Sequence, residues 1–428
     1  MPCLISLTLD LFILIIDSVM SELLDTVRKY ADMFKESVIN DFLNVLSVKA
    51  VNPSMGGEGE FKRGEALYRV LSSYGLDVLE CINVHDGRVP EGLRPNIIGV
   101  IKGDNSSKSL WIISHLDTVP EGDLKLWSTD PFKPVVKDGK IYARGAEDNG
   151  QAIASSMLAL KILRMLGVKP KFNFGVVFVS DEEAGSQYGL KYLLDRGLFK
   201  PEDLIIVPDS GSRDGLKIEI AEKSVLWLKI TTYGKQAHGS TPHKGLNAHR
   251  IGMMYALRID KYLHEKYSDK DPIFIPQEST FEPTKKEANV ASINIIPGVD
   301  TTYFDCRILP RYDVDNVLKD INMLRAEFEE KYGVRIDVEA VLRNDSPPPT
   351  PEDSEVVVRL MEAVRYSRGV KPKTIGIGGG TVAALFRSRG IPAAVWSTVD
   401  ETAHQPNEYA KIENIVADAI VFTLIPLL

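Results

Sequence analysis

The stretch Phe-Gly-Val-Val-Phe-Val-Ser-Asp-Glu-Glu, residues 174–183, decides the fold, because it joins an apolar run of strand length directly to three consecutive acids. Such a run is typical of a strand that is buried on both faces of a sheet. Comparable apolar runs occur at residues 96–101, 110–114 and 204–208. Helical patterns at residues 151–166 and 189–196 alternate with these strands. This alternation predicts an α/β sheet with helices on both faces.

The segments on either side extend the same pattern. An amphipathic helix is expected at residues 23–46, followed by a Gly-rich loop at 52–59 and a helix that ends at Leu71. Near the C-terminus a helix at 355–367, a strand at 393–396 and a last helix at 412–424 continue the α/β order.

The segment that lies between these two α/β regions follows a different pattern of strands and helices. From residue 216 the elements are expected in the order strands 216–221 and 225–233, helix 247–267, a strand pair around 291–307, helix 314–332 and strand 335–341. This βαββαβ order predicts a ferredoxin-like domain inserted in the larger one. The expected division is an N-terminal extension (1–19), a first catalytic segment (20–215), the insertion (216–343) and a second catalytic segment (344–428).

Composition narrows the class of protein. The 428 residues exceed the usual size of one core, and 44% hydrophobic with 26% charged residues is ordinary for a globular chain. A net charge of -8 gives no basic field for a phosphate backbone, so nucleic acid is not an expected partner. Cys3, Cys81 and Cys306 are too far apart for a CxxC site and fit a reducing cytoplasm.

The beginning of the chain is apolar from Leu4 to Ile16 apart from three polar residues. A signal peptide would carry a basic start, but no Lys or Arg precedes Arg28. A membrane span needs about 20 apolar residues, and this run is shorter and contains Asp10. We therefore expect an upstream extension, a functional chain that begins near Met20, a cytoplasmic location and no membrane partner.

Groups that can bind a metal follow several of the predicted strands. They are His115 with Asp117, Asp148 in a Gly-containing loop, the acids 181–183, Asp209, and His404. Alone, each has an ordinary explanation, such as a helix cap or a solvated acidic turn. Because open α/β sheets place their binding crevices at the carboxyl ends of strands, the set together indicates a site there. Asp117 is expected to accept the second N–H of the His115 imidazole.

In order and approximate spacing these motifs resemble the M20 family of zinc aminoacylases, carboxypeptidases and succinyl-diaminopimelate or acetylornithine deacylases, from about Met20 to the C-terminus. The resemblance implies a zinc-peptidase-like α/β/α catalytic domain with an inserted ferredoxin-like dimerisation domain. It also implies two Zn²⁺ ions per subunit, with Co²⁺ or Mn²⁺ as alternatives. Asp148 would bridge the ions, one completed by His115 and Asp209, the other by Glu183 and His404. Two such ions acidify a shared water and polarise the scissile carbonyl.

The resemblance also implies the remaining roles. Glu182, beside a ligand but not itself one, would act as general base and then acid. Asp117, which fixes the tautomer of His115, is counted with Glu182 and His238 among the catalytic residues. His238 would reach the site of the second subunit of a homodimer and stabilise the oxyanion. The substrate is then a small peptide or an N-acyl amino acid, cleaved at an amide bond next to a free carboxylate. That carboxylate would be held by four residues: Arg307, Asn294, Gly379 and Thr381.

Two positions depart from the family pattern. Asn149-Gly150 stands where members commonly have Met-Lys-Gly, and Val382 stands where an Asp is usual. Neither is a proposed ligand, so the departures concern the subgroup and its substrate. A non-catalytic metal-binding homodimer is the alternative from another class, although it would have no need of Glu182. A phosphate-binding loop at 378–381 is a third, but no GxxxxGK[ST] motif accompanies it.

Overall fold

The computed structural model describes the backbone of residues 2–428 and the side chains from residue 19 onward. The chain forms two compact units. The larger contains the residues up to Ile220, Thr350–Thr374 and Leu385–Leu428, and the smaller contains Ala221–Pro349 and Ile375–Ala384. Among the described residues, no helix is both long enough and apolar enough to cross a membrane.

A mixed eight-stranded sheet forms the centre of the larger unit, in the order β1-β2-β6-β3-β7-β16-β8-β15. Its strands are β1 (Val78–His85), β2 (Leu93–Ile101), β3 (Asn105–His115), β6 (Phe172–Val179), β7 (Leu204–Val207), β8 (Lys217–Glu222), β15 (Lys373–Ile377) and β16 (Ala393–Val395). The four strands β6, β3, β7 and β16 run parallel, and antiparallel pairs flank them. The predicted α/β class is confirmed.

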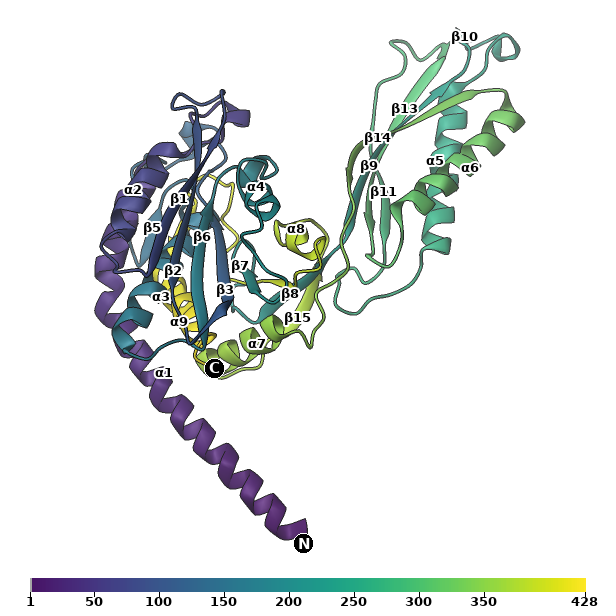
Figure 1. Ribbon diagram of the computed structural model, residues 1–428. Coiled ribbons are helices and arrows are strands. Elements are labelled where there is room, and N and C mark those ends of the chain that lie inside the picture. The colour runs from purple at the N-terminus through teal and green to yellow at the C-terminus, as the bar shows by residue number, and fades with distance from the viewer. Residues whose placement is uncertain (1) are drawn as a thin grey trace. The chain divides into compact units, whose positions relative to one another are not determined.

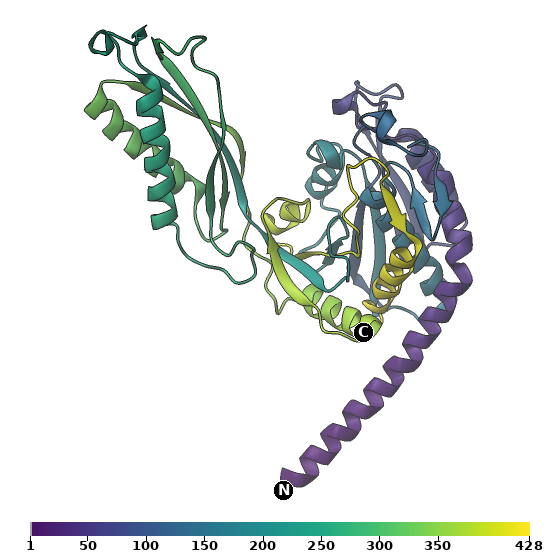
Figure 2. The same ribbon diagram turned by 180° about the vertical axis from the view of Figure 1, so that it is seen from behind.

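Helices cover both faces of this sheet (Figures 1 and 2). They are α1 (Pro2–Leu46), α2 (Phe61–Leu71), α3 (Ala152–Leu166), α4 (Leu190–Asp195), α7 (Glu355–Arg368), α8 (Ala383–Arg387) and α9 (Ile412–Leu424). Helices α1, α3, α7 and α9 pack against one another, and Figure 2 shows α9 in front of the strands, whereas Figure 1 shows α4 there. The side chains of residues 2–18 lie outside the described portion of the chain, so the expected N-terminal extension stays a prediction.

Close packing between strands is visible at Gly175 in β6. A Cβ there would come within 2.2 Å of the Trp111 ring of β3, so only glycine leaves room for the indole. The Trp111 indole N–H donates to Asp203 at 2.9 Å, and the ring meets Phe199 edge-on at 5.7 Å. A strand glycine that admits an approaching ring is a common packing solution.

The parallel register places the ends of the central strands at one edge. His115 at the end of β3 is level with Val179 of β6, and Ile112 is level with Ile206 of β7. A small sheet in the order β17-β5-β4 joins the C-terminal region to the loop before α3; its strands are β4 (Val135–Lys137), β5 (Lys140–Tyr142) and β17 (Tyr409–Lys411). The loops that follow the strands therefore converge.

Short helical turns occur in several of the loops. They are η1 (Pro53–Met55), η2 (Leu124–Leu126), η3 (Ala146–Gln151), η4 (Glu182–Ala184) and η5 (Pro242–Lys244). Two of them, η3 and η4, carry candidate ligands.

The smaller unit is an antiparallel sheet in the order β11-β13-β9-β14, with two helices packed on it. Its elements are β9 (Ser224–Tyr233), β10 (Ala237–His238), α5 (Ala248–Lys266), β11 (Thr280–Lys286), β12 (Ile295–Ile296), β13 (Val299–Ile308), α6 (Val314–Tyr332) and β14 (Arg335–Asn344). The strands β9, β11, β13 and β14 with α5 and α6 give the predicted βαββαβ order. Buried aliphatic and aromatic side chains from both helices and the sheet form one core.

Two element assignments were wrong. Residues 216–221, expected to begin the insertion, form β8, which pairs with β16 in the large sheet. The strand that precedes β13 and pairs with it is β11 (Thr280–Lys286), whereas both strands of this pair were expected around residues 291–307. Strand β11 is mostly exposed and polar, so it has no apolar pattern by which to recognise it.

Candidate metal centre

The first half of the site is built around His115 at the end of β3. Its Nε2 lies 2.8 Å from Asp148 Oδ1 and 3.3 Å from Asp209 Oδ1. On the other side of the ring, Nδ1 lies 2.9 Å from the backbone carbonyl of Asp117 and 3.6 Å from its carboxylate. Burial lowers the pKa of His115, but the Asp209 charge and the hydrogen bonds to the carboxylates outweigh it and hold the pKa well above its ordinary value.

The second half contains His404. Its Nε2 lies 3.0 Å from Asp148 Oδ2 and 3.2 Å from Glu183 Oε1. Hydrogen bonds that the imidazole donates to the Asp148 and Glu183 carboxylates raise the pKa of His404 to about 10. The two oxygens of Asp148 therefore face different imidazoles, one in each half of the site.

These donors fit a pair of metal ions. His115, Asp148 and Asp209 form one group and Asp148, Glu183 and His404 form another, and within each group the donor atoms lie within 4.8 Å of one another. Imidazole nitrogen with carboxylate oxygen is a donor set that zinc binds. The raised pKa values of both histidines point the same way, because they report carboxylates that favour a positive charge at these positions.

The acidic turn after β6 is fixed by hydrogen bonds to the Asp117 carboxylate. The Asp117 carboxylate accepts the backbone N–H of Glu182 at 3.0 Å and that of Glu183 at 3.2 Å. Burial and the Asp209 charge raise the pKa of Glu182 well above its ordinary value. Glu182 belongs to neither donor group within the described residues.

Asn149, one of the departures from the family pattern, lies within the site. Its side-chain N–H₂ donates to Asp209 Oδ1 and to the carbonyl of Pro208, each at 2.9 Å, and its Oδ1 accepts the backbone N–H of His115 at 3.4 Å. This side chain therefore joins the end of β3 to the end of β7 and orients a candidate ligand.

A buried ionic network, which the sequence pattern did not predict, lies beside the acidic turn. Arg94, fully buried in β2, lies 2.6 Å from Glu60, 3.1 Å from Asp86 and 3.3 Å from Asp181. Burial raises the pKa of Glu60 to about 7 despite the arginine. An arginine inside an apolar strand could have indicated this network, because such a side chain needs buried partners.

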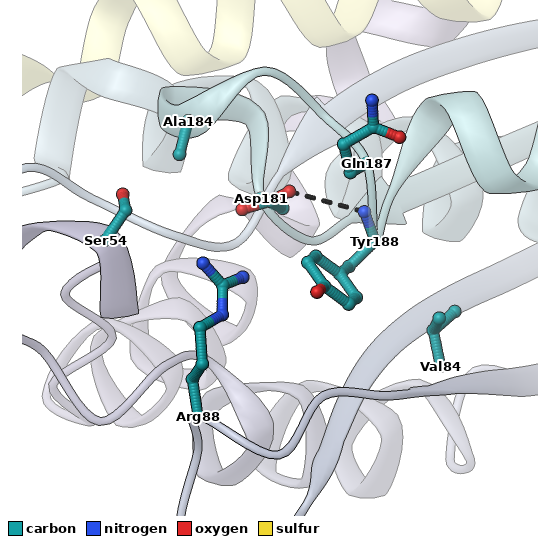
Figure 3. A pocket seen from close by; sticks show the side chains of 7 residues that line it. All are labelled: Ser54, Val84, Arg88, Asp181, Ala184, Gln187 and Tyr188. Atoms are coloured by element: carbon teal, nitrogen blue, oxygen red, sulfur yellow. Dashed lines mark hydrogen bonds between the residues drawn. The ribbon is translucent and has the colours of Figure 1, made fainter.

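Two cavities lie in the larger unit, and one of them is lined by candidate ligands. One of about 310 Å³ is lined by Asp148, Asp209 and Ala403 among others. The second, of about 480 Å³, lies beside the acidic turn at Asp181 and Ala184. Figure 3 shows the Arg88 guanidinium beside the Tyr188 ring in this second cavity, and the guanidinium carbon lies 4.9 Å from the ring centroid.

The other predicted residues belong to the smaller unit. Arg307 makes a two-point contact with Asp305, at 2.6 and 2.9 Å, and donates to the carbonyl of Gly378 at 2.7 Å. The Thr381 backbone N–H donates to Glu222, and Gly379 lies beside it in the same loop.

His238 and Asn294 lie together at the β10–β12 pair, where the Gly239 N–H donates to the Asn294 carbonyl at 2.7 Å. His238 is exposed, and its Nδ1 lies 2.7 Å from the Ser240 hydroxyl. The roles of His238 and of the four substrate-binding residues stay predictions.

Comparisons with known proteins give the family. The model of peptidase family M20/M25/M40 matches residues 111–426. An uncharacterized metallohydrolase of Methanocaldococcus jannaschii is 44% identical over 89% of this chain and 96% of its own length. A succinyl-diaminopimelate desuccinylase of Nautilia profundicola is 27% identical over 90% of this chain and 98% of its own.

A solved structure gives the same fold. The aminopeptidase PepT of Bacillus cereus superimposes with a TM-score of 0.71 at 21% identity, over 92% of this chain and 98% of its own. The chain therefore belongs to peptidase family M20/M25/M40 and is a metallohydrolase of that family.

Proposed function

We propose that the protein is a two-zinc amidohydrolase that cleaves an amide bond next to a free carboxylate, in a dipeptide, at a peptide C-terminus or in an N-acyl amino acid. His115, Asp148 and Asp209 would hold one ion, and Asp148, Glu183 and His404 the other. When bound, the ions supply Lewis acidity for the carbonyl and acidify water. We also keep the predictions of a homodimer and a cytoplasmic location.

The observation that carries the proposal is Glu182. It is adjacent to a donor, belongs to neither donor group within the described residues, and has a carboxyl whose pKa burial raises. Its backbone N–H is fixed by Asp117 at 3.0 Å, so the turn presents this carboxyl reproducibly. A carboxyl that is held beside the candidate ligands without belonging to either group suits both halves of the reaction: it would take a proton from the attacking water and deliver it to the leaving amine. The cavity of about 310 Å³ that is lined by Asp148 and Asp209 would receive the group that flanks the amide.

The test is a turnover screen of metal-loaded protein against dipeptides and against acetylated and succinylated amino acids, with Glu182→Gln as the matched control. The control should keep about two metals per chain and lose turnover by on the order of 10²–10⁴-fold, as expected for loss of a general base. A Glu182→Gln chain that loses its metal but retains its rate would contradict the assignment. A preference for one substrate class identifies the subgroup.

A further inference from the structure

Two buried glutamates lie next to the proposed ligands in sequence but are not among them. Glu147 precedes Asp148 and is 5% exposed, and Glu408 follows His404 after three residues and is 0% exposed. Within the portion of the chain that the structure describes, neither belongs to a donor group. Buried carboxylates need partners, and here each finds them in the loop that contains the other.

Glu408 holds the loop that carries Asp148. Its Oε1 accepts the backbone N–H groups of Glu147 at 2.9 Å and Asp148 at 3.0 Å. Its Oε2 accepts the N–H of Gly145 at 3.0 Å and the Arg144 guanidinium at 2.7 Å. Four hydrogen-bond donors from nearby residues thus converge on one carboxylate. One of them is the backbone amide of Asp148, the residue that both candidate metal-binding groups share.

Glu147 holds the loop that carries His404. Its Oε1 accepts the backbone N–H of Asp400 at 2.6 Å. Its Oε2 accepts the N–H and the hydroxyl of Thr402 and the N–H of Ala403, the last at 3.0 Å. Ala403 is the residue immediately before the histidine, so this carboxylate fixes the backbone from which the imidazole projects.

The backbone of the His404 loop needs such support. Glu401 has a φ of 64° and His404 a φ of 63°, both in the left-handed region of backbone conformation that residues other than glycine rarely adopt. A conformation of this kind persists only where its surroundings enforce it. The three amides held by Glu147 lie just before His404 and on both sides of Glu401.

We propose that Glu147 and Glu408 are reciprocal positioning residues of the metal centre. Glu147, which precedes Asp148, fixes the loop that carries His404, and Glu408, which follows His404, fixes the loop that carries Asp148. Together they set the distance between the Asp148 and His404 donors before a metal binds. This inference rests on the ligands proposed above. It also explains why both must be carboxylates, since an amide side chain would turn an N–H₂ group toward backbone N–H donors.

The two glutamates differ in the number of ions whose binding they should affect. Glu147 fixes only the loop of His404, so Glu147→Gln should weaken the ion held by Asp148, Glu183 and His404. Glu408 fixes the shared Asp148, so Glu408→Gln should weaken both ions. Substitution of residues that orient metal ligands typically weakens metal binding by about 10–100-fold. Because both glutamates fix one pair of loops, the double variant should lose less than the product of the single losses.

The experiment titrates full-length protein with Zn²⁺ against a competing chelator dye and measures both dissociation constants. Asp203→Asn is the matched control: Asp203 is a buried carboxylate of the same unit that accepts two backbone N–H groups and an indole N–H. It binds Ser109, six residues before His115 on β3, so it should leave both constants unchanged. Glu147→Asp, which shortens the reach but keeps the charge, repeats the test in milder form should Glu147→Gln fail to fold.

Three results would overturn the inference. They are unchanged constants in folded Gln variants, equal weakening in Asp203→Asn, and a double variant whose loss equals the product of the single losses. A wild-type chain that binds no Zn²⁺ would instead refute the proposed function. The two failures are therefore distinguishable.

Discussion

Asp418 in α9 offers a quantitative test of buried charge in the larger unit. Its carboxylate is 1% exposed and accepts the Thr398 N–H at 2.9 Å and the Thr398 hydroxyl at 2.5 Å, with Arg368 at 3.3 Å. Burial raises its pKa from the ordinary 3.8 to about 6, even against these hydrogen bonds. The perturbation is Asp418→Asn, which keeps the shape and removes the charge.

The sign follows from the direction of the shift. The folded chain binds the proton more tightly than the unfolded chain, so the contribution of Asp418 to stability is complete below about pH 4 and is lost as the pH rises through about 6. At 1.36 kcal/mol per pKa unit the whole loss is about 3 kcal/mol at pH 8, of which about half has already occurred at pH 5. The gain in stability from Asp418→Asn should therefore be about 1.4 kcal/mol larger at pH 8 than at pH 5.

The assay is urea unfolding of both chains at the two pH values, each in the same excess of chelator. Subtracting the two unfolding free energies at one pH cancels every other titrating group, and comparing the pH values cancels any constant cost of the amide. A difference that is the same at both pH values, or larger at pH 5, would show that the folded chain does not favour the protonated carboxyl.

Three further predictions concern the site and the chain. Asp148→Ala should release both metals but His404→Ala only one, because both donor groups share Asp148; full occupancy of Asp148→Ala by elemental analysis would exclude the sharing. A chain that starts at Met20 should fold, dimerise in gel filtration and turn over as the full-length chain does, and an inactive or insoluble product would give the extension a role. Mixing His238→Ala with Glu182→Gln chains should restore activity if His238 serves the other subunit's site; verified subunit exchange between two inactive variants with no recovery would place His238 in its own subunit's site.

Much of the larger unit could be predicted because its central strands are buried on both faces. Residues 174–179 and 204–208 are uniformly apolar, and the polar groups directly after them had to lie at one edge of a parallel sheet. Of the proposed ligands, His115, Glu183 and Asp209 are expected at this edge for the same reason, whereas the roles of Asp148 and His404 come from the resemblance to the M20 family. Glu147 and Glu408 also lay in these loops, but an acid next to a ligand gives no indication of which backbone its oxygens will meet.

Other features depend on pairing between distant segments. The alternation in residues 216–221 indicates a strand but not its sheet, and β8 finds its partner β16 more than 170 residues later. Arg94 lies beside Asp181 because β2 pairs with β6, and beside Asp86 because that residue follows β1 in the β1–β2 hairpin. Such contacts follow from topology, and local pattern does not contain them.

The position of β16 also bears on the synthesis of the protein. This strand lies between β7 and β8, yet it comes from residues 393–395, close to the end of the chain. As the ribosome extends the chain, the smaller unit receives its last strand, β14, before β16 exists. The large sheet cannot close, and His404 cannot join the candidate ligands that precede it, until residues 393–404 have been translated. The smaller unit's four-stranded sheet is therefore fully synthesised before the candidate metal centre of the larger unit can assemble.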